Sequence, residues 1–142
     1  MTGPAPADDR DRLAVAWVDQ VRAALTRTLA DADRAPRDRD VEALIELIDR
    51  GRRHLDDPRS LTRATAEGIG GAVFELIAIS RARDEGARGR GEEPSDLLPQ
   101  LMFFALRPYL GVDLALAELR RCTRERPPDG KGSASWNTIV HR

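Results

Sequence analysis

The sequence of 142 residues contains a single cysteine, Cys122, and very few aromatic residues. One cysteine excludes an internal disulfide framework and every zinc site built from several cysteines, and it fits a reducing compartment. No run approaches the roughly 18 to 20 apolar residues of a spanning helix, and the first residues lack the basic and apolar segments of a secretory signal. We therefore expect a cytoplasmic protein with no membrane association.

The sequence also lacks an excess of charge of one sign, because 23 basic residues face 24 acidic ones and the net charge is -1. This balance gives no support to the broad phosphate neutralisation that dominates DNA affinity. All the basic residues except Lys131 are arginine. We interpret the arginine excess as codon bias in a GC-rich genome, and we expect no DNA binding by this chain alone.

Strict alternation of apolar and polar residues, the pattern of a half-buried strand, is missing as well, and only residues 136–140 have any strand-like character. Apolar residues recur instead at helical spacing, which predicts an all-α fold of about five helices in one bundle. The predicted domain spans residues 8–125, between a disordered start (1–7) and a disordered tail (126–142).

The predicted helices are separated by proline and glycine. In the first helix an apolar residue recurs every four positions, as at Trp17, Val21 and Leu25, which is typical of one buried face. Residues 86–93 read GARGRGEE, without any hydrophobic period, and predict a loop. We expect the five helices at about 8–32, 38–50, 61–83, 94–110 and 112–125.

Three glycines, Gly68, Gly70 and Gly71, lie inside the predicted third helix. Their spacing does not match the G-x-G-x-x-G pattern of a nucleotide loop, and no strand precedes them. Each glycine within a helix costs roughly 0.5 to 1 kcal/mol relative to alanine. The three together favour close packing of another helix over a local kink.

Residues that carry catalytic chemistry are few. His54 lies at a helix end among arginines and His141 lies in the tail, so spacing places no nucleophile beside a base. Cys122 has no partner for redox chemistry, and Glu75, on a largely apolar helix, is expected to form a structural ion pair. No carboxylate and histidine set has metal-ligand spacing. We therefore expect neither enzyme activity nor a metal site nor a cofactor.

One segment, residues 98–106, is apolar on nearly every side of its helix. An apolar surface of this size on a small chain usually marks an interface, and the commonest interface is a two-fold one between identical chains. A buried core helix is the alternative. We expect a homodimer.

Three short segments together resemble the C-terminal domain of TetR-family transcriptional regulators. They are GGAVFELI (Gly70–Ile77), LLPQL (Leu97–Leu101) and RPYLG (Arg107–Gly111), separated by a polar, glycine-rich stretch. The resemblance covers about residues 61–115, and it rests on the order and spacing of the three segments. It implies a TetR C-terminal-domain-like bundle that senses a small hydrophobic or aromatic ligand and forms a homodimer.

The resemblance also implies residues for two sites. Position by position, it assigns the dimer interface to Gly70, Phe74, Ile77, Leu101, Phe104 and Ala105. It places a ligand pocket among the preceding helices, lined by Trp17, Val21, Leu44, Ile48, Val73 and Phe103.

TetR-like regulators begin with a three-helix DNA-binding region that contains a helix-turn-helix. Nothing before Trp17 matches that region, so we expect a fragment, a late-start product or a naturally short relative. The leading interpretation is a regulatory domain for small-molecule sensing and homodimerisation. The alternative is a helical interaction protein that pairs with a full-length regulator and sequesters it from DNA.

Overall fold

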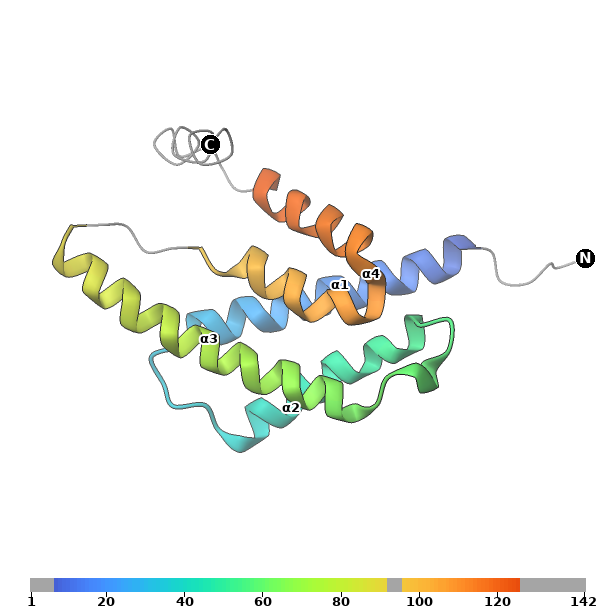
Figure 1. Ribbon diagram of the computed structural model, residues 1–142, viewed down its shortest axis with the longest axis horizontal. Coiled ribbons are helices and arrows are strands. Elements are labelled where there is room, and N and C mark those ends of the chain that lie inside the picture. Colours follow the sequence, from blue (N-terminus) through green and yellow to red (C-terminus); the bar gives the residue numbers. More distant parts are fainter. Residues whose placement is uncertain (1–6, 92–95, 126–142) are drawn as a thin grey trace, which may run out of the picture.

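The computed structural model describes residues 7–91 and 96–125, which form four α-helices and no strand, so the all-α prediction is confirmed for this part of the chain. The helices are α1 (Ala7–Ala30), α2 (Asp38–Asp49), α3 (Arg63–Gly89) and α4 (Leu98–Glu125), with two short 3-10 helices, η1 (Arg50–His54) and η2 (Pro58–Ser60), between α2 and α3. Helix α2 packs against α3, and α1 packs against α4 (Figure 1). The predicted disordered tail and nearly all of the predicted disordered start lie outside the described residues. Ala7 already begins α1.

The core lies where the four helices meet. Its largest fully buried side chains come from every α-helix: Val21, Leu25, Ile48, Val73, Leu101, Met102 and Leu106. Burial of each such side chain contributes about 1.5 to 3 kcal/mol relative to exposure, which makes this cluster the main source of stability. None of the described helices is both long and apolar enough to cross a membrane.

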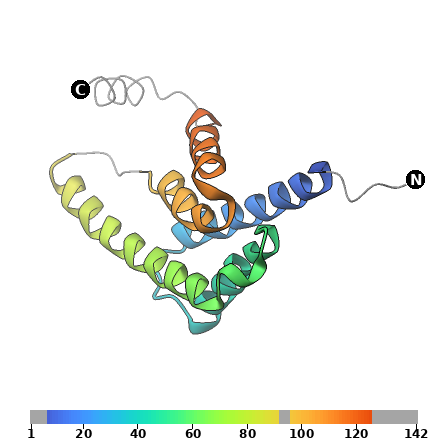
Figure 2. The same cartoon turned by 45° about the vertical axis from the view of Figure 1, so that its right-hand side comes forward.

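Helix α1 follows the predicted four-residue period over only part of its length. Trp17, Val21 and Leu25 are buried, whereas Leu13, which belongs to the same period, is exposed. The first turns of α1 extend past the other helices (Figure 2).

The C-terminal end of α3 corrects the loop predicted at residues 86–93. The helix continues through Gly86 to Gly89, and Ala87 is buried. One glycine costs at most about 1 kcal/mol in a helix, and the surrounding alanine, arginine and glutamate residues are good helix formers. The helix ends where Gly91 adopts a φ of 77°, a left-handed conformation that glycine commonly supplies at helix ends.

Helix α4 spans the ranges predicted for the fourth and fifth helices. Its helical backbone is interrupted between them at Gly111, as predicted, where φ is 83° and ψ is 169°. Pro108 lies within the helical part before this break. The part of α4 after Gly111 projects away from α2 and α3 (Figures 1 and 2), and it keeps contact with α1 through Glu118 and Arg121.

The glycine cluster of α3 packs closely at one position. A Cβ atom on Gly70 would lie 2.7 Å from Cγ1 of Ile45 on α2, whereas Gly68 and Gly71 have open space around them. The close approach expected from the sequence is therefore made at Gly70 only. The helix that approaches Gly70 is α2 of the same chain.

Candidate ligand pocket and dimerisation face

The six residues predicted to line a ligand pocket lie together in the structure. Five are buried and Phe103 is half-buried, and all six belong to or pack against the same hydrophobic core. The structure has two pockets of note in its described part, and only Leu44 of the six borders either of them. The predicted residues form packed interior, and the concave surface lies beside it.

The larger pocket has a volume of about 660 Å³ and lies between the end of α1, the α1–α2 connection, α2 and α3. Its floor is apolar, because Leu44 and Ile77 are buried there and Leu47 and Phe74 are half-buried. This volume falls in the range of about 300 to 1,000 Å³ that is typical of small-molecule sites.

The rim of this pocket is charged. Four exposed arginines and two aspartates border it: Arg27, Arg34, Arg37, Arg39, Asp31 and Asp40. Within residues 7–91 and 96–125, the ion pairs that form involve other arginines and none of these four. Sequence reasoning missed this site because the arginines of residues 34–39 were attributed to codon usage. Their density between two helices was the available signal.

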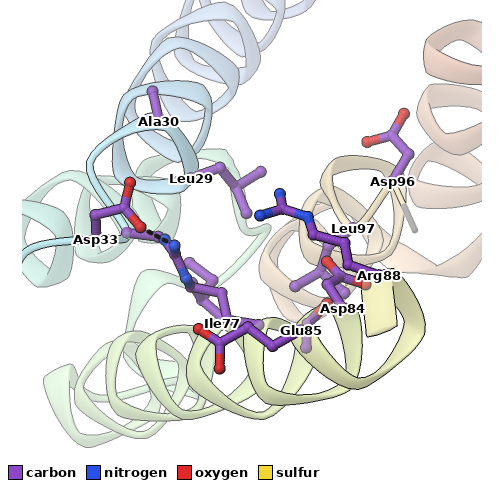
Figure 3. Close-up of a pocket in the computed structure, with 12 residues that line it drawn as sticks. Leu29, Ala30, Asp33, Ile77, Asp84, Glu85, Arg88, Asp96 and Leu97 are labelled. Atoms are coloured by element: carbon purple, nitrogen blue, oxygen red, sulfur yellow. Dashed lines mark hydrogen bonds and ion pairs between the residues drawn. The ribbon is translucent and has the colours of Figure 1, made fainter. Parts of the chain in front are cut away.

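The smaller pocket, of about 370 Å³, lies between the end of α1, α3 and the start of α4 (Figure 3). It shares Ala32 and Ile77 with the larger one, but four carboxylates and only two arginines border it. Arg81 pairs with Asp33 across its wall (Figure 3). The two neighbouring pockets therefore have opposite charge.

An aromatic cluster lies next to the floor of the larger pocket. The indole N–H of Trp17 donates a hydrogen bond of 2.8 Å to the carbonyl oxygen of Leu47, which lines that pocket. The Trp17 ring lies 5.4 Å from the ring of His54 and 5.5 Å from that of Tyr109, edge-on to the latter. Trp17 thus joins the pocket floor to η1 and α4.

Burial shifts the pKa of both rings that contact Trp17. Desolvation, aided by the nearby Asp49 carboxylate, raises the pKa of Tyr109 to about 12. Desolvation and then the charge of Arg53 lower the pKa of His54. Both shifts favour the neutral form, so the cluster is uncharged near neutral pH.

The residues predicted for the dimer interface are largely covered by the chain itself. Gly70, Ile77, Leu101 and Ala105 are buried, Phe74 is half-buried, and Phe104 is the exposed member. The predicted helices nevertheless carry other exposed apolar side chains. On α3, Leu76 and Ile79 are 39% and 44% exposed, and on α4 Phe104 is 39% exposed. We call these three residues the α3–α4 apolar set.

A second group of exposed apolar side chains lies on α1 and on the part of α4 after Gly111. It comprises Leu13 and Val15 near the start of α1, with Val112 and Leu114 just after the break in α4. An isolated exposed apolar residue needs no explanation, but recurring ones on one element favour an interface. The two groups provide a direct comparison for mutagenesis.

The residues considered for catalysis are not assembled into a site. Glu75 is exposed on α3, and the thiol of Cys122 lies 3.7 Å from Oε1 of Glu118. The ring of His54 contacts that of Trp17. In the described ranges, no group of three or more histidine, cysteine or carboxylate side chains is arranged to hold a metal ion.

Comparisons with protein-family models, curated proteins and solved structures found no match. Inference about function therefore depends on the pockets, the apolar set and the resemblance of the sequence segments.

Proposed function

We propose that this chain is a regulatory domain that forms a homodimer and senses a small molecule, as the TetR-like segments imply. The observation that carries the proposal is the α3–α4 apolar set. Leu76 and Ile79 lie three residues apart on α3, and Phe104 lies on α4. These are the two helices that the resemblance assigns to the dimer, although the exposed positions differ from those it assigned.

The sensing part of the proposal is supported by the larger pocket. It is bordered by α1, α2 and α3, and its wall includes Phe74 and Ile77, which lie on the same helix as Leu76 and Ile79. A ligand that binds better to one arrangement of these helices shifts the population towards it. In an intact regulator, such a helix shift would change the separation of two DNA-binding regions.

The test is the solution mass of the purified chain by light scattering across a dilution series. We expect the parent to be a dimer. Phe104→Glu and Ile79→Glu should each dissociate it, because a carboxylate placed in an apolar interface must lose its hydration. Circular dichroism should show that both variants keep their helical content.

The matched control is Leu114→Glu, which changes a still more exposed apolar residue of α4 beyond the break. It should leave the dimer intact. If Leu114→Glu dissociates the dimer and Phe104→Glu does not, the interface lies at the second group of exposed apolar residues instead. A parent that is monomeric at every concentration would overturn the homodimer.

A further inference from the structure

The geometry of the larger pocket points to its ligand class: we infer that it binds an organic anion with an apolar body. This inference rests on the proposed function, because the anion would be the molecule that the domain senses. Its physical basis is separate from the dimer. It depends on the apolar floor, the arginine rim and the start of α2.

The floor provides the contact for an apolar body. Leu44, Leu47, Phe74 and Ile77 come from two helices and offer aliphatic and aromatic surface at the bottom of the pocket. Burial of an apolar group against this surface stabilises the complex by about 25 cal/mol per Å² of apolar surface removed from water. A small hydrophilic anion gains nothing from this surface.

The rim provides the charge. Four arginines border the pocket against two aspartates, and none of the four pairs with a carboxylate in the described part of the chain. An arginine guanidinium binds a carboxylate or phosphate through two parallel hydrogen bonds. The rim can therefore bind an anionic head group without first breaking an ion pair within the protein.

The start of α2 adds a second source of positive potential. Arg37 and Arg39, which border the pocket, lie at the N-cap and in the first turn of α2. The side chain of Arg37 makes no capping hydrogen bond. The first N–H groups of a helix have no partner within it, and they favour anions through the helix dipole. Asp38 and Asp40 offset part of this effect.

The smaller, acidic pocket supports the assignment of an anionic ligand to the larger one. Four carboxylates and two arginines border that pocket, so its lining has a net negative charge, whereas the lining of the larger pocket has a net positive one. The sign of the ligand charge therefore selects between two neighbouring concave surfaces.

Binding has a built-in optical signal. Leu47 lines the pocket, and its carbonyl oxygen accepts the hydrogen bond from the Trp17 indole. The sequence has two tryptophans, and the other is Trp136. In a Trp136→Phe background, a change in fluorescence on titration therefore reports the environment of Trp17.

The experiment titrates this protein with octanoate, octanol and acetate by fluorescence and calorimetry. Octanoate has both the charge and the apolar chain, octanol lacks the charge, and acetate lacks the chain. We expect octanoate to bind at least about tenfold more tightly than octanol, because a charge-assisted hydrogen bond contributes about 1.5 kcal/mol or more. It should also bind more tightly than acetate, because its chain buries apolar surface on the floor of the pocket.

Variants at the rim test the location of the site. Arg34→Gln and Arg37→Gln change exposed side chains and should each weaken octanoate binding by about fivefold. Arg59→Gln, at an exposed arginine of η2 away from the pocket, should leave it unchanged. Equal affinity for octanol and octanoate, no octanoate binding at all, or an equal effect of Arg59→Gln would each overturn the inference.

The outcomes also separate this inference from the proposed function. If the parent is monomeric but prefers octanoate, the homodimer is contradicted and the anion site is supported. If the parent is a dimer that shows no preference for octanoate, only the anion site is contradicted.

Discussion

Gly51 lies against Trp17 so closely that a Cβ atom at Gly51 would be 2.4 Å from Cζ2 of the indole. The same Cβ would lie 2.8 Å from Cγ of Tyr109, so two buried rings close the space on that side. The two rings contact each other, and the ring of Trp17 also contacts that of His54. This glycine is therefore required by packing, since its backbone has no positive φ.

We expect Gly51→Ala to lower the free energy of unfolding by about 1 to 3 kcal/mol, as overpacking of a core does. Gly68→Ala is the matched control, because nothing lies within 4 Å of the added Cβ atom on α3. It should raise the free energy of unfolding by about 0.5 to 1 kcal/mol through helix propensity. Urea unfolding measures the free energy of unfolding of both variants. If Gly51→Ala leaves this free energy unchanged, the two rings move apart at little cost.

Tyr109 should ionise only at high pH, and its ionisation should destabilise the fold. Its pKa is about 12 in the folded chain, against an ordinary value of about 10, because burial disfavours the phenolate. Its contribution to stability is fully present below about pH 10 and is lost as the pH rises towards 12. Tyr109 is the single tyrosine of the sequence, so ultraviolet absorbance follows its ionisation directly.

The control for this titration is Tyr109→Phe. The buried hydroxyl of Tyr109 has no hydrogen-bond partner in the described part of the chain. The variant should therefore lose the alkaline dependence without a large loss of stability near neutral pH. A tyrosine that ionises at about pH 10 in the folded protein would contradict the buried position.

His54 should act at the opposite end of the pH scale. Burial and the neighbouring Arg53 lower its pKa below the ordinary value of about 6.5. The unfolded chain then binds a proton before the folded one does, so stability is fully present above about pH 6.5 and falls as the pH decreases below it. Unfolding measured across this range should show the decrease in the parent and in His141→Gln, but not in His54→Gln.

The ion pair between Arg22 and Glu118 should stabilise the second part of α4 against α1. Glu118 is only 12% exposed and also contacts Arg121. Removal of its charge leaves the partly buried Arg22 with only the more exposed Asp19 as a partner, so we expect Glu118→Gln to cost about 1 to 3 kcal/mol. Hydrogen exchange should become faster in residues 112–122.

Glu42→Gln is the comparison for this pair. Glu42 is 56% exposed and pairs with Arg63, which is also well exposed. A solvated ion pair contributes about 0 to 1 kcal/mol, so this variant should have little effect. Equal losses from the two glutamine variants would contradict the importance of burial at Glu118.

The sequence predicted the helical class and most of the interior well, because apolar side chains at 3.6-residue spacing must be covered. Trp17, Val21 and Ile48 are core residues for that reason. Leu13 fits the same period yet is exposed, because periodicity identifies a face and does not say how far the partner helices extend.

The break at Gly111 and the helix after it were both predicted, because a glycine soon after a proline interrupts a helix and apolar residues resume beyond it. The φ of 83° at Gly111 and the ion pair of Glu118 with Arg22 on α1 were not predicted, since local composition specifies neither backbone angles nor tertiary contacts. Helix propensity likewise carried α3 past Gly86 to Gly89, against the apparent polar loop.

The candidate sites were harder to predict because both depend on which side of a helix faces outward. Position-by-position transfer assigned Ile77 to a dimer, whereas the chain buries Ile77 and exposes Leu76 beside it. The arginine rim is formed by α1, the α1–α2 connection and the start of α2, which come together only when the chain turns back at Pro36.

The sharp bend at Gly111 makes α4 two rods joined at a single pivot. The proximal rod is anchored by buried apolar residues such as Leu101 and Leu106, whose packing salt does not weaken. The distal rod is held at Ala115 and by charged contacts between Arg22, Glu118, Arg121 and Asp19. Dissolved ions screen the exposed contact between Arg121 and Asp19 far more than the largely buried one between Arg22 and Glu118. We therefore expect rising ionic strength to weaken only the outermost contact of the distal rod, while Ala115 and Glu118 keep it against α1.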